Sequence, residues 1–329
     1  EYYIFEPDRI GCAVRDALAE RARAGVAVRL LVDAVGSAAL SRRFLRPLRE
    51  AGAEVVFFHP FRLATLKPLL NLRTHRKIAV IDGRIGFTGG INVTDTQDER
   101  VHSGAFRDLH LRIEGAAVNG LQQVFVEDWL YASKRPLLQH GLFPLLGGGE
   151  IALQWIASGP DTPQEPIHRA MLQAIGDAER RVWLVTPYFV PTEPALYALT
   201  NAARRGVDVR LLLPRRADSR IVTYASRSYF DELLRAGVRV FQYQPRMLHT
   251  KALLVDDGLC TLGSANFDAR SFRLNFELCV NLYGTPAAQA LQTVIEEDFA
   301  QAREVCRPRR LGLGQRLAEA GARLFSPLL

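Results

Sequence analysis

Stretches with helical and strand-like spacing of apolar residues alternate along the chain. In residues 9–24 the apolar positions recur on one face of a helix, and residues 26–36 then alternate as in a half-buried strand. The same order returns at 41–52, which Gly52 closes as a helix, and at 53–59, which predict a second strand. This alternation predicts an α/β architecture in which helices cover mixed sheets.

Two pairs of short strands follow the same plan in the two halves of the sequence. Residues 77–83 and 84–90 predict a hairpin that turns at Asp-Gly, and residues 251–258 and 259–265 predict the same hairpin again. A local element that recurs in this way suggests that the two halves share one fold.

Five polar and glycine positions recur around these hairpins with one constant interval (249 − 75 = 266 − 92 = 174). In each copy the histidine is expected to enter a strand, with the lysine two residues later on the same face. The positions are His75, Lys77, Asp82, Gly89 and Asn92 in the first copy and His249, Lys251, Asp256, Gly263 and Asn266 in the second.

The repeat interval is too long for a solenoid unit, so it indicates duplication of a whole domain half. The flanks agree with this interpretation, because residues 24–33 resemble 205–214 and residues 48–60 resemble 233–245. Different offsets in these flanks place insertions in loops. One insertion, at 61–74, lies ahead of the first histidine.

The expected boundary between the halves is the segment 136–149, which is rich in Leu, Gly and Pro. Helices at 116–133 and 286–303 are expected to close the two halves. The predicted organisation is a first half at 1–148, a second half at 149–304 and an amphipathic tail at 305–329.

The first half begins inside a strand-like run, EYYIFEPD, whereas the second half has a strand and a helix ahead of the matching run. We therefore expect that the first half is incomplete at its N-terminal side. A preceding segment is expected to hold a strand, a helix and possible membrane anchors.

The 329 residues are 48% hydrophobic and carry a net charge of +7. This composition predicts a globular chain of roughly two domains with an anionic partner, which could be nucleic acid, a membrane or a phosphorylated substrate. Nearly all the cations are arginines, and two of the four lysines, Lys77 and Lys251, lie in the repeated motif.

The four cysteines, Cys12, Cys260, Cys279 and Cys306, show no C-x-x-C pair or metal-like grouping and are expected to be buried free thiols. No apolar run reaches the roughly 18 residues that a membrane span needs. Any membrane contact of this chain is therefore expected to be peripheral.

The repeated motif suits chemistry at phosphorus. A histidine can act as nucleophile or proton carrier, while a lysine and an asparagine donate hydrogen bonds to an anionic tetrahedral group. Two copies that face each other would supply a nucleophile, an acid for the leaving oxygen and donors for the remaining oxygens. Zinc is a weaker alternative, because lysine is not a zinc ligand at neutral pH and no third histidine or cysteine lies at ligand spacing. No metal and no cofactor are expected.

The duplicated H-x-K-x4-D motif resembles that of the phospholipase D superfamily over essentially the whole chain. The runs TLGSANFDARSFRLNFE (261–277), TPYFVP (186–191) and RDLHLRIEG (107–115), with the terminal SPLL, are similar to bacterial cardiolipin synthases. This resemblance implies two similar α/β halves related by a pseudo-twofold axis, with one active site at their interface.

The resemblance also implies a covalent mechanism. His75 would attack the phosphodiester to form a phosphohistidine, while His249 would protonate the departing alcohol and then deprotonate the incoming hydroxyl. The phosphoryl oxygens would be held by Lys77, Lys251, Asn92 and Asn266. Ser264 would add a hydroxyl that its counterpart Gly90 cannot supply.

The family pattern includes a carboxylate behind each catalytic imidazole. Asp108 and Glu277 occupy matching places after the two motifs and are the candidates, although ordinary acids at strand edges would show the same spacing. Asp82 and Asp256 precede turns, so they and the motif glycines Gly89 and Gly263 are expected to fix the geometry of the motif.

Two function classes remain open for this sequence. A transphosphatidylase would join two phosphatidylglycerol molecules with release of glycerol, or use phosphatidylethanolamine as donor. A hydrolase or metal-independent nuclease of the same superfamily would instead transfer the phosphoryl group to water. An inactive scaffold is disfavoured because both motifs are intact.

The apolar inserts at 61–74 and 136–146 and the tail disfavour nucleic acid as a partner. In the tail one helical face would carry Leu313, Leu317, Ala320, Leu324 and Leu328, which is typical of a helix at a membrane surface. A closing helix packed on the protein's own core is the alternative. The resemblance implies a peripheral location on the bacterial inner membrane, and the oligomeric state stays open.

Overall fold

The computed structural model describes residues 1–60, 71–306, 309 and 311–326. The chain divides into two compact units. The first unit comprises Glu1–Phe106 and His110–Gly149, and the second comprises Arg107–Leu109 and the chain from Glu150 onward. The short segment Arg107–Leu109 thus belongs to the second unit although its neighbours in sequence belong to the first.

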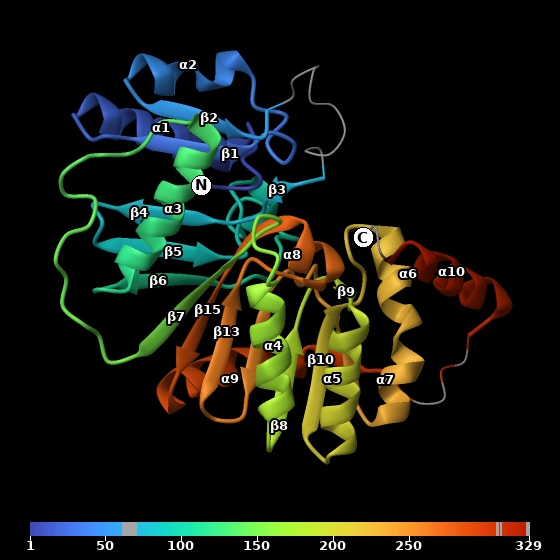
Figure 1. The fold of residues 1–329 in the computed structure, drawn as a ribbon. Helices are drawn as coiled ribbons and strands as arrows, with labels where there is room; N and C mark the ends of the chain where they lie inside the picture. Colours follow the sequence, from blue (N-terminus) through green and yellow to red (C-terminus); the bar gives the residue numbers. More distant parts are fainter. Residues whose placement is uncertain (61–70, 307–308, 310, 327–329) are drawn as a thin grey trace. The chain divides into compact units, whose positions relative to one another are not determined.

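The first unit begins with two helix–strand pairs (Figure 1). Asp8 and Ser41 cap the two helices by accepting a backbone N–H three residues later, which satisfies donors that a helix start leaves open. The two strands pair in parallel, with Arg29 opposite Glu54. The elements are α1 (Arg9–Arg23), β1 (Arg29–Asp33), α2 (Arg42–Glu50) and β2 (Glu54–Phe58). The predicted strand at 26–36 is therefore shorter than its apolar run.

The rest of the first unit is an antiparallel sheet with a covering helix. Asp82 and Gly83 join its first two strands with positive φ angles of 54° and 64°, as a tight hairpin turn of this kind requires. The elements are β3 (Arg73–Thr74), β4 (Ile78–Ile81), β5 (Ile85–Gly89), η2 (Asp95–Gln97), β6 (His110–Glu114) and α3 (Val118–Ser133). The sheet order is β4-β5-β6.

In the second unit, eight strands of one mixed sheet are paired in the order β16-β11-β10-β8-β12-β13-β15-β7. The neighbours β8, β10 and β11 run parallel, and the remaining pairs are antiparallel. The strands are β7 (Ala152–Ser158), β8 (Arg181–Val185), β10 (Asp208–Pro214), β11 (Arg239–Tyr243), β12 (Ala252–Val255), β13 (Leu259–Gly263), β15 (Asn275–Tyr283) and β16 (Ala302–Glu304).

Helices cover both faces of this sheet (Figure 1). Val182 and Leu184 of β8 join the apolar core under α4 and α5, whereas Trp183 between them packs edge-on against Phe299 of α9. The elements are α4 (Pro166–Asp177), β9 (Phe189–Val190), α5 (Glu193–Arg204), α6 (Arg220–Ser228), α7 (Phe230–Ala236), β14 (Phe267–Asp268), α8 (Ala269–Arg273), α9 (Thr285–Ala300) and α10 (Leu313–Leu324).

The hairpin predicted twice has the same register in both units. Ile78 pairs with Thr88 in the first unit, and Ala252 pairs with Leu262 in the second. Both partners are displaced by the interval of the sequence repeat (252 − 78 = 262 − 88 = 174). The expectation of two similar α/β halves is thereby confirmed, although the first unit has one parallel strand pair and one antiparallel sheet in place of a mixed sheet.

Several sequence expectations need correction. The motif histidines do not lie inside strands, because β4 begins at Ile78 and β12 at Ala252, after the motif lysines. All four cysteines are free, but Cys306 is exposed and Cys12 half-buried, so only two of the four are buried. The insert at 61–74 lies mainly outside the described residues, and so does Leu328 of the tail.

Candidate active site

The second motif is held in place by the segment that crosses from the first unit. Arg107 pairs with Leu248 as a parallel bridge. The Arg107 N–H donates to the Met247 carbonyl at 2.8 Å, and the His249 N–H donates to the Arg107 carbonyl at 2.7 Å. These two bonds place the side chain of Asp108 beside that of His249.

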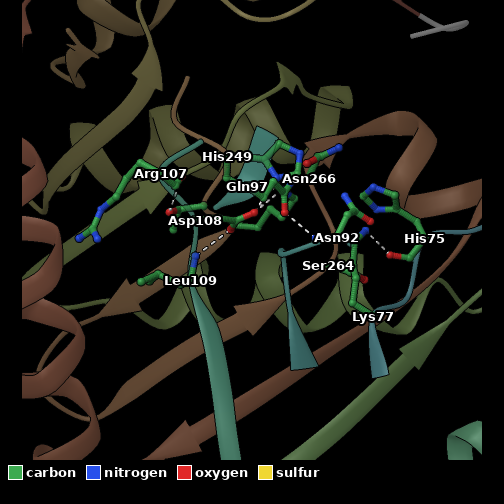
Figure 2. A network of polar contacts seen from close by, with 12 residues as sticks. His75, Lys77, Asn92, Gln97, Arg107, Asp108, Leu109, His249, Ser264 and Asn266 are labelled. Atoms are coloured by element: carbon green, nitrogen blue, oxygen red, sulfur yellow. Dashed lines mark hydrogen bonds and ion pairs between the residues drawn. The ribbon is translucent and has the colours of Figure 1, made fainter. Parts of the chain in front are cut away.

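Asp108 and His249 form a buried pair. Oδ2 of Asp108 lies 2.6 Å from Nδ1 of His249, and their side chains are 2% and 7% exposed (Figure 2). The Leu109 N–H donates to Oδ1 of Asp108 at 2.8 Å, which fixes the carboxylate plane. A carboxylate accepts only, so it selects the tautomer of His249 with the proton on Nδ1 and the lone pair on Nε2.

Lys251 brings a cation against this pair. Its Nζ donates to the His249 carbonyl and lies 3.9 Å from Oδ2 of Asp108. Nζ is also 2.9 Å from Nδ1 of His249, but that nitrogen gives its proton to Asp108 and therefore cannot accept a hydrogen bond from the lysine. Burial lowers the pKa of Lys251 to about 8, against the opposing effect of Asp108. Burial would raise the pKa of Asp108, yet Lys251 and His249 together hold it below its usual value.

Ser264 and Glu277 lie close together in the second unit. Oγ of Ser264 donates to the Glu277 carboxylate and accepts from the Leu278 N–H at 3.0 Å. Glu277 is fully buried and also accepts from Nδ2 of Asn275 at 3.2 Å. The Ser264 hydroxyl proton is thus used on Glu277 in this geometry, which favours a role in orienting that carboxylate over direct binding of phosphate.

Asn266 follows β13 and is fixed through its backbone, whose N–H donates to Oγ of Ser271 at 3.1 Å. The side chain of Asn266 is buried, and its Oδ1 has no hydrogen-bond partner among the described residues. A buried amide with an unused oxygen is a group for which an active-site ligand or water is expected.

The first motif repeats the local geometry within its own unit. Nζ of Lys77 donates to the His75 carbonyl at 2.5 Å (Figure 2). Nζ of Lys251 donates to the His249 carbonyl in the same way. The lysine and the His75 ring both approach Tyr3, with the lysine 5.6 Å and the imidazole 5.0 Å from its ring centre. Lys77 is completely buried.

Asn92 is oriented by two contacts within the first unit. Its Oδ1 accepts the Ile4 N–H at 3.2 Å, and its backbone N–H donates to Oε1 of Gln97 at 2.5 Å. Gln97 and Ser271 therefore take the same place relative to the two motif asparagines. The two units share the contact of each motif lysine with its histidine carbonyl and the contact that fixes the backbone of each motif asparagine.

The motif aspartates and glycines shape the hairpins. Asp82 and Asp256 have positive φ angles of 54° and 50° at the turns. The Asp256 carboxylate also accepts the backbone N–H groups of Glu179, Arg180 and Arg181, which ties the turn to the start of β8. A Cβ at Gly263 would lie 2.3 Å from the Leu278 carbonyl oxygen, so only glycine fits there.

One part of the site was not anticipated. Nε of Arg107 donates to Oδ1 of Asp298 at 2.8 Å, and Asp298 is buried on α9. This ion pair anchors the residue next to Asp108. The similar runs VEDW (126–129) and IEEDF (295–299) were a sequence signal for this ion pair, because their aspartates are Asp128 and Asp298. Asp128 likewise forms a buried ion pair with Arg76, the neighbour of His75 in sequence.

Within the described parts of the chain, no group of three or more histidine, cysteine, aspartate or glutamate side chains could hold a metal ion. No helix among the described residues is long and apolar enough to cross a membrane.

Comparison with solved structures agrees with the fold. Phosphatidylserine synthase from Haemophilus influenzae Rd KW20 superposes with a TM-score of 0.73 at 14% identity, over 99% of this chain and 87% of that one. At this identity the likeness concerns the fold alone.

Sequence comparison places the chain more narrowly. The family model described as "Cardiolipin synthase, PLD-like domain" matches residues 2–129 and 171–299. Cardiolipin synthase 1 of Bacillus anthracis is 42% identical, over 100% of this chain and 67% of that protein. Cardiolipin synthase of Geobacillus kaustophilus is 45% identical with the same coverage.

The chain therefore belongs to the cardiolipin synthase family of phospholipase D-like proteins. It is a phosphatidyltransferase of that superfamily, as the sequence resemblance implied.

Proposed function

We propose that this protein makes cardiolipin by transferring the phosphatidyl group of one phosphatidylglycerol to a hydroxyl group of a second, with release of glycerol. The observation that carries the proposal is the buried Asp108–His249 pair beside Lys251, in a member of this family. A histidine with its Nδ1 proton held by a carboxylate is suited to giving and taking protons at Nε2.

The first step forms a covalent intermediate. Nε2 of His75 attacks phosphorus, a P–N bond forms, and the bond from phosphorus to the glycerol oxygen breaks. His249 starts this step as an imidazolium and gives its Nε2 proton to the departing oxygen. Asp108 stabilises the charged form of His249 before the transfer and keeps the neutral ring in the correct tautomer afterwards.

The second step reverses the proton movement. His249 takes the proton from a hydroxyl of the incoming phosphatidylglycerol, whose oxygen attacks phosphorus. The P–N bond breaks, which returns His75 to its neutral form and leaves His249 charged for the next turnover. The two roles require the two motifs to meet at one phosphate, which stays a prediction of the duplicated sequence.

The motif lysines and asparagines are proposed to hold the phosphoryl oxygens while negative charge builds up on them. Buried ammonium and amide groups that are already oriented cost little reorganisation during the reaction, and removing one such donor raises a barrier by about 2.7–4 kcal/mol. The fixed geometry of Lys77 and Lys251 over their own histidine carbonyls supports this assignment.

The proposed substrates imply that the enzyme works at a membrane. Phosphatidylglycerol and phosphatidylethanolamine, the possible alternative donor, reside in bilayers, so the protein is proposed to work as a peripheral protein on the bacterial inner membrane. Nucleic acid is not proposed as a substrate.

Product analysis tests this function. The protein is incubated with phosphatidylglycerol labelled in both glycerol and phosphate, in mixed micelles with a chelator. Cardiolipin and free glycerol in equal amounts are expected. Phosphatidic acid as the sole lipid product would show that water accepts the phosphatidyl group and would refute the transferase assignment.

A further inference from the structure

The tail helix α10 packs on the protein with the face opposite to its leucines. Its main neighbour is α6, and the buried residues of α10 are Glu319 and Ala322. Nη2 of Arg309 donates to both carboxylate oxygens of Glu319, at 2.7 and 2.9 Å. Small and polar side chains therefore fix this helix to the second unit.

The large apolar side chains of α10 point away from this contact. Leu313, Leu317 and Leu324 are 76%, 64% and 81% exposed, and Phe325 just after the helix is 51% exposed. The three leucines recur at spacings of four and seven residues, so they share one face. A surface helix normally buries such an apolar face against the protein core. An exposed apolar face therefore indicates a surface that a membrane or another molecule covers.

The charge on α10 indicates what covers it. Arg316 and Arg323 are exposed beside the leucines, whereas the only acid between Leu311 and Ser326, Glu319, is buried in its ion pair with Arg309. Arg323 lies 4.4 Å above the ring of Tyr229 and pairs with Glu232 at 3.3 Å, so its charge is partly neutralised and Arg316 supplies the exposed cation. The exposed surface of α10 is thus apolar and cationic, which complements an anionic lipid surface.

The length of the helix excludes a membrane span. Its 12 residues extend about 18 Å, less than the roughly 30 Å of a bilayer core. A helix of this length with one apolar face lies in the plane of the membrane, with its leucines among the acyl chains and its arginines at the headgroups.

We infer that α10 is a membrane-docking helix, which seats the second unit on an anionic bilayer through Leu313, Leu317, Leu324 and Phe325. This inference rests on the proposed function, since that function draws lipid substrates from such a bilayer. The inference concerns attachment to the membrane and not the phosphatidyl transfer, so the docking inference and the proposed function can be refuted independently.

Vesicle binding tests the docking helix with single substitutions on the intact chain. Leu317→Glu and Leu324→Glu each place a carboxylate on the proposed docking face. Tyr197→Glu is the matched control, because Tyr197 lies on α5 of the same unit and is 68% exposed, close to the 64% of Leu317. Cosedimentation is measured with vesicles of phosphatidylglycerol and of phosphatidylcholine.

The unchanged protein is expected to prefer the anionic vesicles, and each leucine substitution is expected to weaken that binding at least tenfold, since it removes apolar insertion and adds repulsion. Arg316→Ala is expected to weaken it about fivefold, with a smaller dependence on salt. Tyr197→Glu is expected to bind as the unchanged protein does.

Equal binding by Leu317→Glu and the unchanged protein would overturn the inference, as would an equal loss in Tyr197→Glu. A change of oligomeric state in Leu317→Glu without a change in vesicle binding would instead show that this face joins two copies of the chain. Turnover of a short-chain, water-soluble phosphatidylglycerol reports on the proposed function separately, and all four variants are expected to retain it.

Discussion

The carboxylate of Asp108 lies 2.6 Å from Nδ1 of His249, although the two residues are 141 positions apart and belong to different copies of the sequence repeat. The acid that follows the first motif therefore serves the histidine of the second. The crossing segment Arg107–Leu109 makes this possible, because it leaves the first unit and pairs along Leu248.

Replacing Asp108 with Asn should abolish most of the activity without unfolding the protein. The amide keeps the shape of the carboxylate but neither stabilises the His249 imidazolium nor enforces its tautomer, so kcat is expected to fall by about 10²–10⁴. Initial rates with saturating phosphatidylglycerol measure this change. A kcat within a factor of three of the unchanged enzyme would show that the pair has no catalytic role. Asp108→Glu is expected to recover part of the loss.

Asp298 is predicted to be a positioning residue for Asp108, because it holds Arg107. Asp298→Ala leaves the largely buried Arg107 guanidinium without this partner, which should lower the free energy of unfolding by about 3 kcal/mol. It should also lower kcat at temperatures where the variant stays folded. Urea unfolding and initial rates test both effects.

A second ion pair serves as the control that separates the effect of Asp298→Ala from the general effect of losing an ion pair. Arg239 and Glu304 form an ion pair with half-exposed side chains, and Glu304→Ala should change the unfolding free energy by less than about 1 kcal/mol and leave kcat unchanged. If Asp298→Ala lost stability but kept full kcat and an unaltered pH profile, Asp298 would be structural only.

Activity should fall as the pH rises through about 8, the pKa of Lys251, because a neutral amine no longer stabilises the phosphoryl charge. Stability should change in the opposite sense. The folded protein loses this proton near pH 8, whereas an unfolded lysine keeps it until about pH 10.4, so this group favours folding more strongly as pH rises between these values. Parallel rate and unfolding measurements in Lys251→Met should lack both dependences. An activity profile of the unchanged protein that stays flat to pH 10 would contradict the role of the lysine.

Gly263→Ala should destabilise the second unit strongly. The added methyl group would lie 2.3 Å from the Leu278 carbonyl oxygen and 2.7 Å from Cα of Cys279, both backbone atoms that cannot move aside cheaply. We expect a loss of about 3 kcal/mol in unfolding free energy. Gly258→Ala in the same hairpin meets nothing within 4 Å and should cost less than about 1 kcal/mol. Equal losses of unfolding free energy in the two variants would show that the backbone near Leu278 and Cys279 moves to accommodate the added methyl group.

The sequence predicted the hairpins well because their signals are local. An Asp-Gly turn and two apolar strands determine a hairpin without reference to distant residues, and no insertion disturbs the interval between the two copies. The same local signals wrongly predicted that the motif histidines lie in strands. Regular strand pairing starts only after the motif lysines, at Ile78 and Ala252.

Contacts between residues far apart in the sequence were harder to predict from the sequence. Spacing identified Asp108 as a partner for a histidine, but the crossing of Arg107–Leu109 into the second unit decides which histidine it meets. The tail pattern predicted an amphipathic helix, but the pattern could not say which face packs inward. Contact with α6 through Ala322 and the Arg309–Glu319 ion pair decides that question.

The division of labour between the two histidines is tested most directly with a donor whose leaving group needs no acid, such as phosphatidyl-p-nitrophenol. With His249→Ala, this donor should give a burst of one p-nitrophenolate per active site and then stop, because the second step lacks its base. Mass spectrometry should find the phosphatidyl group on the peptide that contains His75, and His75→Ala should show no burst. A burst in His75→Ala with the adduct on His249 would reverse the assignment, and the absence of an adduct in both variants would contradict a phosphohistidine intermediate.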